Sequence, residues 1–187
     1  MKKTIKDYQY KDKTVIIRCD LNVPIKNNKI EDDTRIKESL SSINYLIDNN
    51  AKIIILSHLG KIKTEEDKIN NTLYPVYLKL KELLNTNVYF SKELMGESLE
   101  EKVKNLKEKE VLLIENTRYA DYPDKLESSC DLNLAKYWAS LGDIFINDAY
   151  GTTHRKHASN VGISQFLPSA IGFLIEKEMT KLDSIMN

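Results

Sequence analysis

Ile53-Ile54-Ile55-Leu56-Ser57-His58 joins four consecutive apolar residues to a hydroxyl and an imidazole. A run of large apolar residues without alternation is typical of a strand whose two faces are both buried, as in a parallel sheet. Further short runs of this kind are also predicted as strands: Thr14–Arg18, Val88–Phe90, Val111–Ile114 and Ile144–Ile146. The chain is therefore expected to form a parallel sheet that is covered on both sides.

Helical patterns lie between and after these runs. In residues 34–48 the apolar Ile36, Leu40, Ile43 and Ile47 are spaced for one helical face. Similar patterns cover Leu73–Leu84, Glu97–Leu106, Leu132–Leu141 and Ile171–Met186, and Lys61–Asn71 and Ala120–Asp131 are expected to be polar loops. The alternation predicts an α/β fold, a three-layer α/β/α domain with a mainly parallel, Rossmann-like sheet and one core.

The composition is that of a soluble globular protein. The chain has 187 residues, 41% of them hydrophobic and 30% charged, and its formal net charge is zero. A neutral molecule has no overall attraction to nucleic acid or to a membrane, so neither is an expected partner. No apolar segment follows Met1-Lys2-Lys3, so a cytoplasmic location is expected, with Cys19 and Cys130 as reduced thiols.

Arginine is rare in this chain. Only four of the 28 basic residues are arginines: Arg18, Arg35, Arg118 and Arg155. The planar guanidinium binds phosphate or carboxylate through two parallel hydrogen bonds, which lysine cannot do, so the arginines are the first candidates for function. Arg18 lies inside a predicted strand and is expected to make a structural ion pair, so it is left out of the site.

Polar residues follow the predicted strands at the edge where open parallel sheets bind their ligands. These segments are Asp20–Pro24, Ser57–Lys61, Glu115–Tyr119 and Asn147–His157, and they hold all three histidines and two of the four arginines. Each has a plainer alternative: Asp20 and Asn22 as turn formers, His58 as a loop-packing residue, residues 154–157 as a solvated basic loop. Together they favour a pocket for a small phosphorylated acid.

Arg35 follows Asp33-Thr34, which is predicted to cap the helix of residues 34–48. A cation in the first helical turn opposes the helix dipole, typically at about 0.3–1 kcal/mol. The arrangement is explained if an anion binds there to the helix N–H groups and the guanidinium. The alternative is an exposed ion pair with Asp32 or Asp33.

Several common motifs are absent from the sequence. Gly60-Lys61 lacks the upstream glycine and the following Ser or Thr of a phosphate-binding P-loop, and none of the six glycines forms G-x-G-x-x-G. No nucleophile elbow and no metal-ligand spacing is found. No cofactor and no metal site is therefore expected in this chain.

The motifs resemble those of phosphoglycerate kinases. Arg18–Pro24 resembles the R-x-D-[FL]-N-V-P opening of that family, and Asp32–Ile36 its D-D-T-R-I segment. The remaining matches are Ser57–Lys61 with S-H-L-G-[RK], Glu115–Arg118 with E-N-x-R, and Asn147–Arg155 with N-D-A-[FY]-G-x-x-H-R. Their order and spacing agree from about Asp20 to Glu178.

The resemblance implies reversible phosphoryl transfer between 1,3-bisphosphoglycerate and ADP, giving 3-phosphoglycerate and ATP. It implies a catalytic role for Arg35, which would neutralise the transferring phosphoryl group. It implies that Arg118 and Arg155 bind the 3-phosphate and that Gly60 lets the loop backbone approach the ligand. Lys61 departs from the arginine of many relatives, which weakens its contribution. The implied substrate-binding residues are Asp20, Leu21, Asn22, Arg35, His58, Leu59, Gly60, Lys61, Arg118 and Arg155.

Phosphoglycerate kinases are about twice as long as this chain, and the family places MgATP or MgADP on a C-terminal domain. Residues 1–170 then correspond to the acid-substrate domain and residues 171–187 to the start of the interdomain helix. We expect a cytoplasmic monomer that is inactive without its own C-terminal domain. The alternative is a stand-alone module that binds phosphorylated acids without catalysis, whereas a small dehydrogenase or phosphatase is disfavoured by the missing motifs.

Overall fold

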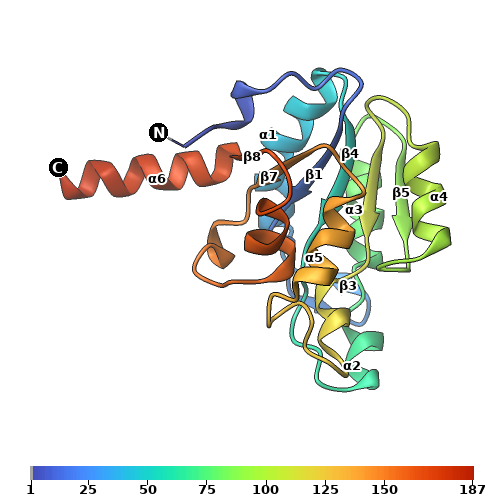
Figure 1. Cartoon of the computed structure of the whole chain (residues 1–187). Helices are drawn as coiled ribbons and strands as arrows, with labels where there is room; N and C mark the ends of the chain where they lie inside the picture. Colours follow the sequence, from blue (N-terminus) through green and yellow to red (C-terminus); the bar gives the residue numbers. More distant parts are fainter. Residues whose placement is uncertain (1) are drawn as a thin grey trace.

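A six-stranded parallel sheet forms the centre of the computed structural model, which describes residues 2–187 (Figure 1). Its spatial order is β5-β6-β4-β1-β7-β8, and every neighbouring pair is parallel. The strands are β1 (Thr14–Arg18), β4 (Lys52–Leu56), β5 (Val88–Ser91), β6 (Val111–Ile114), β7 (Ile144–Asn147) and β8 (Ser169–Ile171). The five predicted strands are confirmed, whereas β8 was assigned in part to the final helix and in part to no element.

Helices cover both faces of the sheet, as Figure 1 shows. They are α1 (Thr34–Asp48), α2 (Glu65–Asn70), α3 (Tyr74–Leu83), α4 (Glu97–Asn105), α5 (Leu132–Ala139) and α6 (Phe173–Met186). Ile53 and Ile55 of β4 face the cluster that contains the apolar residues of α1 and α3. Ile54 faces the opposite cluster, which contains Leu99 of α4 and Trp138 of α5. This alternation confirms the three-layer α/β/α architecture.

A short helix and a small hairpin were also not predicted. The segment assigned to a polar loop contains α2, whose first turn is held by reciprocal hydrogen bonds between Thr64 and Asp67. A separate antiparallel pair, β2 (Ile25–Lys26) and β3 (Lys29–Ile30), is joined by Asn27 and Asn28. Both asparagines have positive φ, the backbone geometry that a two-residue hairpin turn requires. Neither element has an apolar periodicity, which is why the sequence pattern did not reveal them.

The final helix is attached to the sheet through Asp148, which follows β7. Its Oδ1 accepts the N–H of Leu174, in the first turn of α6, at 2.9 Å. Gly172 leaves room for this carboxylate, because a Cβ at that position would lie 2.2 Å from Asp148 Oδ1. Asp148 is only 1% exposed, and burial raises its pKa to about 6. Beyond this attachment α6 runs away from the sheet (Figure 1).

The raised pKa of Asp148 predicts a pH-dependent stability. The folded state keeps the carboxyl proton up to about pH 6, whereas the unfolded chain loses it near the ordinary value of 3.8. This group therefore stabilises the fold below pH 3.8, and its contribution is lost as pH rises through 6. Relative to the Asp148→Asn variant, the free energy of unfolding of the wild type should fall by up to about 3 kcal/mol between pH 4 and pH 7. Urea unfolding at several pH values measures this, and a difference that does not vary with pH would contradict it.

Candidate anion-binding site

A cleft of about 310 Å³ lies where β1, β4, β6 and β7 end. It is lined by Asp20, Asn22, Arg35, His58, Gly60, Lys61, Arg118, Gly151, Thr152 and Arg155. Eight of the ten residues predicted to bind substrate are therefore brought together. Gly151 and Thr152 were not singled out, although the segment that contains them was.

The two remaining residues, Leu21 and Leu59, are buried in the core, so their side chains do not line the cleft. The N–H of Leu21 donates to Ser57 Oγ at 2.9 Å. The N–H of Leu59 donates to Asn116 Oδ1 at 3.1 Å, and its carbonyl accepts from Asn116 Nδ2 at 2.7 Å. Both leucines fix the backbone of the cleft loops, and any direct role in binding stays a prediction.

Asn116 is a buried residue whose side chain joins three loops by hydrogen bonds, a role that was not predicted from the sequence. Besides Leu59, its side chain binds the carbonyl of Asn71 at 2.9 Å and the N–H of Arg118 at 3.0 Å. Its motif position is the only sequence signal that could have pointed to it. These hydrogen bonds fix the backbone from which the Arg118 side chain extends into the cleft.

Gly60 is required by its backbone conformation and by the space around it. Its φ is +59°, in the left-handed region, and a Cβ would lie 2.4 Å from Asn71 Oδ1. Its N–H donates to Asn22 Oδ1 at 3.0 Å, which joins the loop after β4 to the loop after β1. The close neighbour of Gly60 is thus Asn71, and the predicted approach of its backbone to a ligand remains a prediction.

Arg35 extends from the first turn of α1 to the loop after β1. Its guanidinium donates to the carbonyl of Asn22 at 2.8 Å and lies 3.4 Å from Asp20 Oδ1, and its side chain is 52% exposed. The alternative partners are engaged elsewhere: Asp32 accepts from Thr34, and Asp33 lies 3.4 Å from Lys37 and from Lys79. The expected cap is therefore wrong in detail, because Asp33 occupies the cap position but Asp32 makes the hydrogen bond.

The cleft carries an excess of positive charge. No ion pair found within residues 2–187 involves Lys61, Arg118 or Arg155. Arg118 is only 7% exposed, and its buried Nε has no hydrogen-bond partner in the described part of the chain. Asp20 is the single carboxylate among the residues that line the cleft. A buried guanidinium without a partner is unfavourable, so the geometry fits an anionic ligand that would supply one.

Arg18 does not make the ion pair expected of it, and this prediction is wrong. Among the described residues no carboxylate lies within ion-pair distance of its guanidinium, which is fully buried. The guanidinium donates instead to the carbonyl of Cys19, to Ser159 Oγ at 2.9 Å and to His58 Nδ1 at 2.8 Å. Arg18 was left out of the site, yet it directly contacts a residue that lines it.

His58 is a neutral imidazole with a defined proton. Burial lowers its pKa to about 2, with further lowering by the nearby charges of Arg18, Arg118, His157 and Arg155. A guanidinium can only donate, so Nδ1 must accept from Arg18 and the ring proton lies on Nε2. The ring therefore offers the cleft a neutral hydrogen-bond donor.

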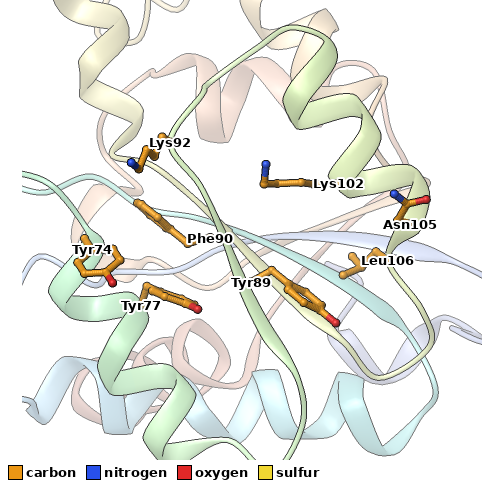
Figure 2. Close-up of a pocket in the computed structure, with 8 residues that line it drawn as sticks. All are labelled: Tyr74, Tyr77, Tyr89, Phe90, Lys92, Lys102, Asn105 and Leu106. Atoms are coloured by element: carbon orange, nitrogen blue, oxygen red, sulfur yellow. The ribbon is translucent and has the colours of Figure 1, made fainter.

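A larger pocket of about 550 Å³ lies at the open edge of β5, away from the strand ends (Figure 2). It is lined by Tyr74, Tyr77, Tyr89, Phe90, Lys92, Lys102, Asn105 and Leu106. Figure 2 shows Tyr74 and Tyr77 on α3, and Lys102 and Asn105 on α4 across β5. None of its residues belongs to the segments that were predicted to bind, so the smaller cleft is the stronger candidate.

The described residues form neither a metal centre nor a membrane-spanning helix. Within residues 2–187, no group of three or more His, Cys, Asp or Glu side chains is arranged to hold a metal ion. The helices of that same part of the chain are all too short or too polar to cross a membrane. Cys19 and Cys130 are both free and buried.

Comparison with known proteins gives a consistent result. The family model described as phosphoglycerate kinase matches residues 5–187. The phosphoglycerate kinase of Macrococcus caseolyticus is 50% identical over 186 residues, and that of Staphylococcus aureus strain bovine RF122 is 52% identical over 186 residues. In each case the match covers 100% of this chain and 47% of the relative, so the chain spans about half the length of these curated relatives.

Two solved structures are similar to nearly all of the chain. That of phosphoglycerate kinase from Coxiella burnetii has a TM-score of 0.84 and 33% identity, and covers 98% of this chain and 44% of its own. That of phosphoglycerate kinase from Pyrococcus horikoshii OT3 has a TM-score of 0.84 and 35% identity, and covers 95% and 44%.

The neutral state of His58 can be tested directly. Because its pKa is lowered to about 2, the ring should not titrate between pH 4.5 and pH 8. The Cε1–H resonance of His58, assigned by comparison with the His58→Gln variant, should stay constant over this range in NMR spectra of the unliganded protein. Free imidazole in the same sample provides the reference titration. A sigmoidal shift of the His58 resonance in this range would show that the ring takes up a proton.

Proposed function

Since the chain belongs to the phosphoglycerate kinase family, we propose that its cleft binds the glycerate substrate, 3-phosphoglycerate or 1,3-bisphosphoglycerate. The observation that carries this proposal is a group of cations, Lys61, Arg118 and Arg155, for which residues 2–187 provide no carboxylate partner. They lie beside the neutral donor His58. A phosphate and a carboxylate on a short carbon chain match both their charge and the cleft volume of about 310 Å³.

We assign the ends of the substrate by the chemistry of the cleft. Arg118 and Arg155 bind the 3-phosphate, and His58 donates its Nε2–H to a phosphate oxygen. Asp20 and Asn22, on the loop after β1, bind the hydroxyl and the carboxyl end of the glycerate. Lys61 supplies a more flexible charge at the exposed rim, because its ammonium lacks the planar fork of arginine.

Arg35 is the residue to which we assign catalysis. Its half-exposed guanidinium lies beside Asn22 and Asp20, to which we assign the hydroxyl and carboxyl end of the substrate. Phosphoryl transfer depends mainly on positioning and on stabilising charge that spreads over the phosphoryl oxygens. A cation held by a backbone carbonyl can stabilise this charge with little reorganisation.

The second substrate of the proposed reaction is a nucleotide. We propose that MgADP or MgATP is held by a C-terminal domain outside this sequence, to which α6 leads, and that the isolated chain transfers no phosphoryl group. Residues 1–170 would form the substrate domain and residues 171–187 the start of the interdomain helix. A glycolytic role, a cytoplasmic location and a monomeric state are part of the same proposal.

Binding of 3-phosphoglycerate to the isolated chain tests the site itself. Titration by calorimetry or NMR should show saturable binding at or below millimolar concentration. Arg118→Gln should weaken it by about tenfold to a hundredfold, because a charged hydrogen bond is worth about 1.5–3 kcal/mol. Lys92→Gln removes a cation from the other pocket and is the matched control, with an expected effect under twofold. A folded chain that fails to bind 3-phosphoglycerate at millimolar concentration would overturn the proposed site.

The role of Arg35 is tested in a full-length phosphoglycerate kinase that contains this domain. Arg35→Ala should lower kcat by several orders of magnitude while weakening 3-phosphoglycerate binding far less, because the guanidinium acts mainly on the transition state. Arg35→Lys retains the charge and should have an intermediate kcat. A loss in kcat below tenfold, or about 1.4 kcal/mol, would remove the catalytic role.

A further inference from the structure

A buried chain of hydrogen bonds leads from Glu127 to the cleft. Glu127 Oε2 accepts from Ser159 Oγ at 2.6 Å, Arg18 Nε lies 2.9 Å from the same Oγ, and Arg18 Nη2 lies 2.8 Å from His58 Nδ1. The first three residues are fully buried, and His58 is 7% exposed. The four residues come from four different segments, so the contact depends on the complete fold.

In each hydrogen bond of this series, from Glu127 to His58, the donor and the acceptor can be identified. The backbone N–H of Ser159 also donates to the Glu127 carboxylate, at 2.8 Å, so Ser159 is held at two points. With its hydroxyl proton directed to Glu127, Ser159 Oγ offers only lone pairs to Arg18 Nε. The guanidinium in turn can only donate to His58. The Glu127 carboxylate thus interacts with Arg18 indirectly, through the Ser159 hydroxyl.

We propose that Glu127, Ser159 and Arg18 are positioning residues that orient His58 and fix its Nε2–H tautomer. This inference rests on the proposed function, in which His58 donates to a phosphate oxygen of the substrate. Without the Ser159 hydroxyl, the Arg18 guanidinium would lose the hydrogen bond of its Nε and could turn away from the imidazole. The ring would then be free to carry its proton on Nδ1 and would offer the substrate a lone pair that repels phosphate oxygens.

The arrangement of these hydrogen bonds indicates that they position His58 rather than only pack the core. A buried arginine is neutralised most directly by contact with a carboxylate, and Glu127 is close enough to reach it through a single hydroxyl. Instead the carboxylate bonds, among the described residues, only to Ser159, and Nη2 of the arginine is directed to His58 in the cleft. Charge-assisted hydrogen bonds of this kind are strong and directional, and the partner of one histidine nitrogen decides which nitrogen carries the proton.

The tautomer can be measured without any substrate. Nitrogen-15 spectra of the wild type should show His58 as a single Nε2–H tautomer, assigned with the His58→Gln variant. Ser159→Ala should convert this signal to a mixture of tautomers, and Ser159→Thr, which restores a hydroxyl, should recover the wild-type pattern. Ser164→Ala is the matched control, because the exposed Ser164 hydroxyl donates to the carbonyl of Val161 in its own turn, at 2.7 Å, and not to any residue of the cleft that the structure describes. If Ser159→Ala does not fold, Glu127→Gln, which keeps an acceptor but removes the charge, takes its place.

Substrate binding provides the second measurement. Ser159→Ala should weaken 3-phosphoglycerate binding about tenfold in the wild type but less than twofold when His58→Gln is already present. A purely structural role would give the same factor in both backgrounds and would overturn the inference. So would an unchanged His58 tautomer in the substituted protein. If the wild type binds no 3-phosphoglycerate, the proposed function fails, while the tautomer measurement still decides whether the hydrogen-bond chain controls His58.

Discussion

The parallel hydrogen-bonded ladder between β1 and its neighbours is the constraint on which the rest of the molecule depends. Its register pairs Arg18 with Leu56 of β4 and with Asn147 of β7, so three strands end at the same level. Loops that are distant in the sequence therefore leave the sheet side by side. The helices on both faces cannot cover this edge, and polar residues that would be scattered in an extended chain meet there.

The electrostatics of the cleft follow from where carboxylates are placed and where they are absent. Arg18 lies beneath the cleft and is compensated inside the protein, by Ser159 and through it by Glu127. Arg118 is almost as deeply buried, but its Nε has no partner in residues 2–187. The first arginine therefore belongs to the scaffold and the second is ready for a ligand, although the two are the same residue type with similar burial.

Much of this organisation could be predicted from the sequence, because it depends on short-range pattern. The apolar runs identified five strands, and the segments after them contain seven of the eight predicted residues that line the cleft. The eighth, Arg35, was identified from its place in the first turn of a helix. The three residues of β8 are too few for such a pattern. Arg18 was misjudged because its partner Ser159 lies 141 positions away and nothing local to either residue indicates the contact. Leu21 and Leu59 lie within the motifs, but the motif cannot show that their side chains point into the core.

Asp148 joins one side of the cleft to the final helix. The segment that begins with this residue also carries Gly151, Thr152 and Arg155, which line the cleft. At its start it is joined to α6 by two hydrogen bonds, from Gly172 to the carbonyl of Asn147 and from Leu174 to Asp148 Oδ1. Because these bonds join the start of α6 to the segment that lines the cleft, neither can shift relative to the other without breaking them.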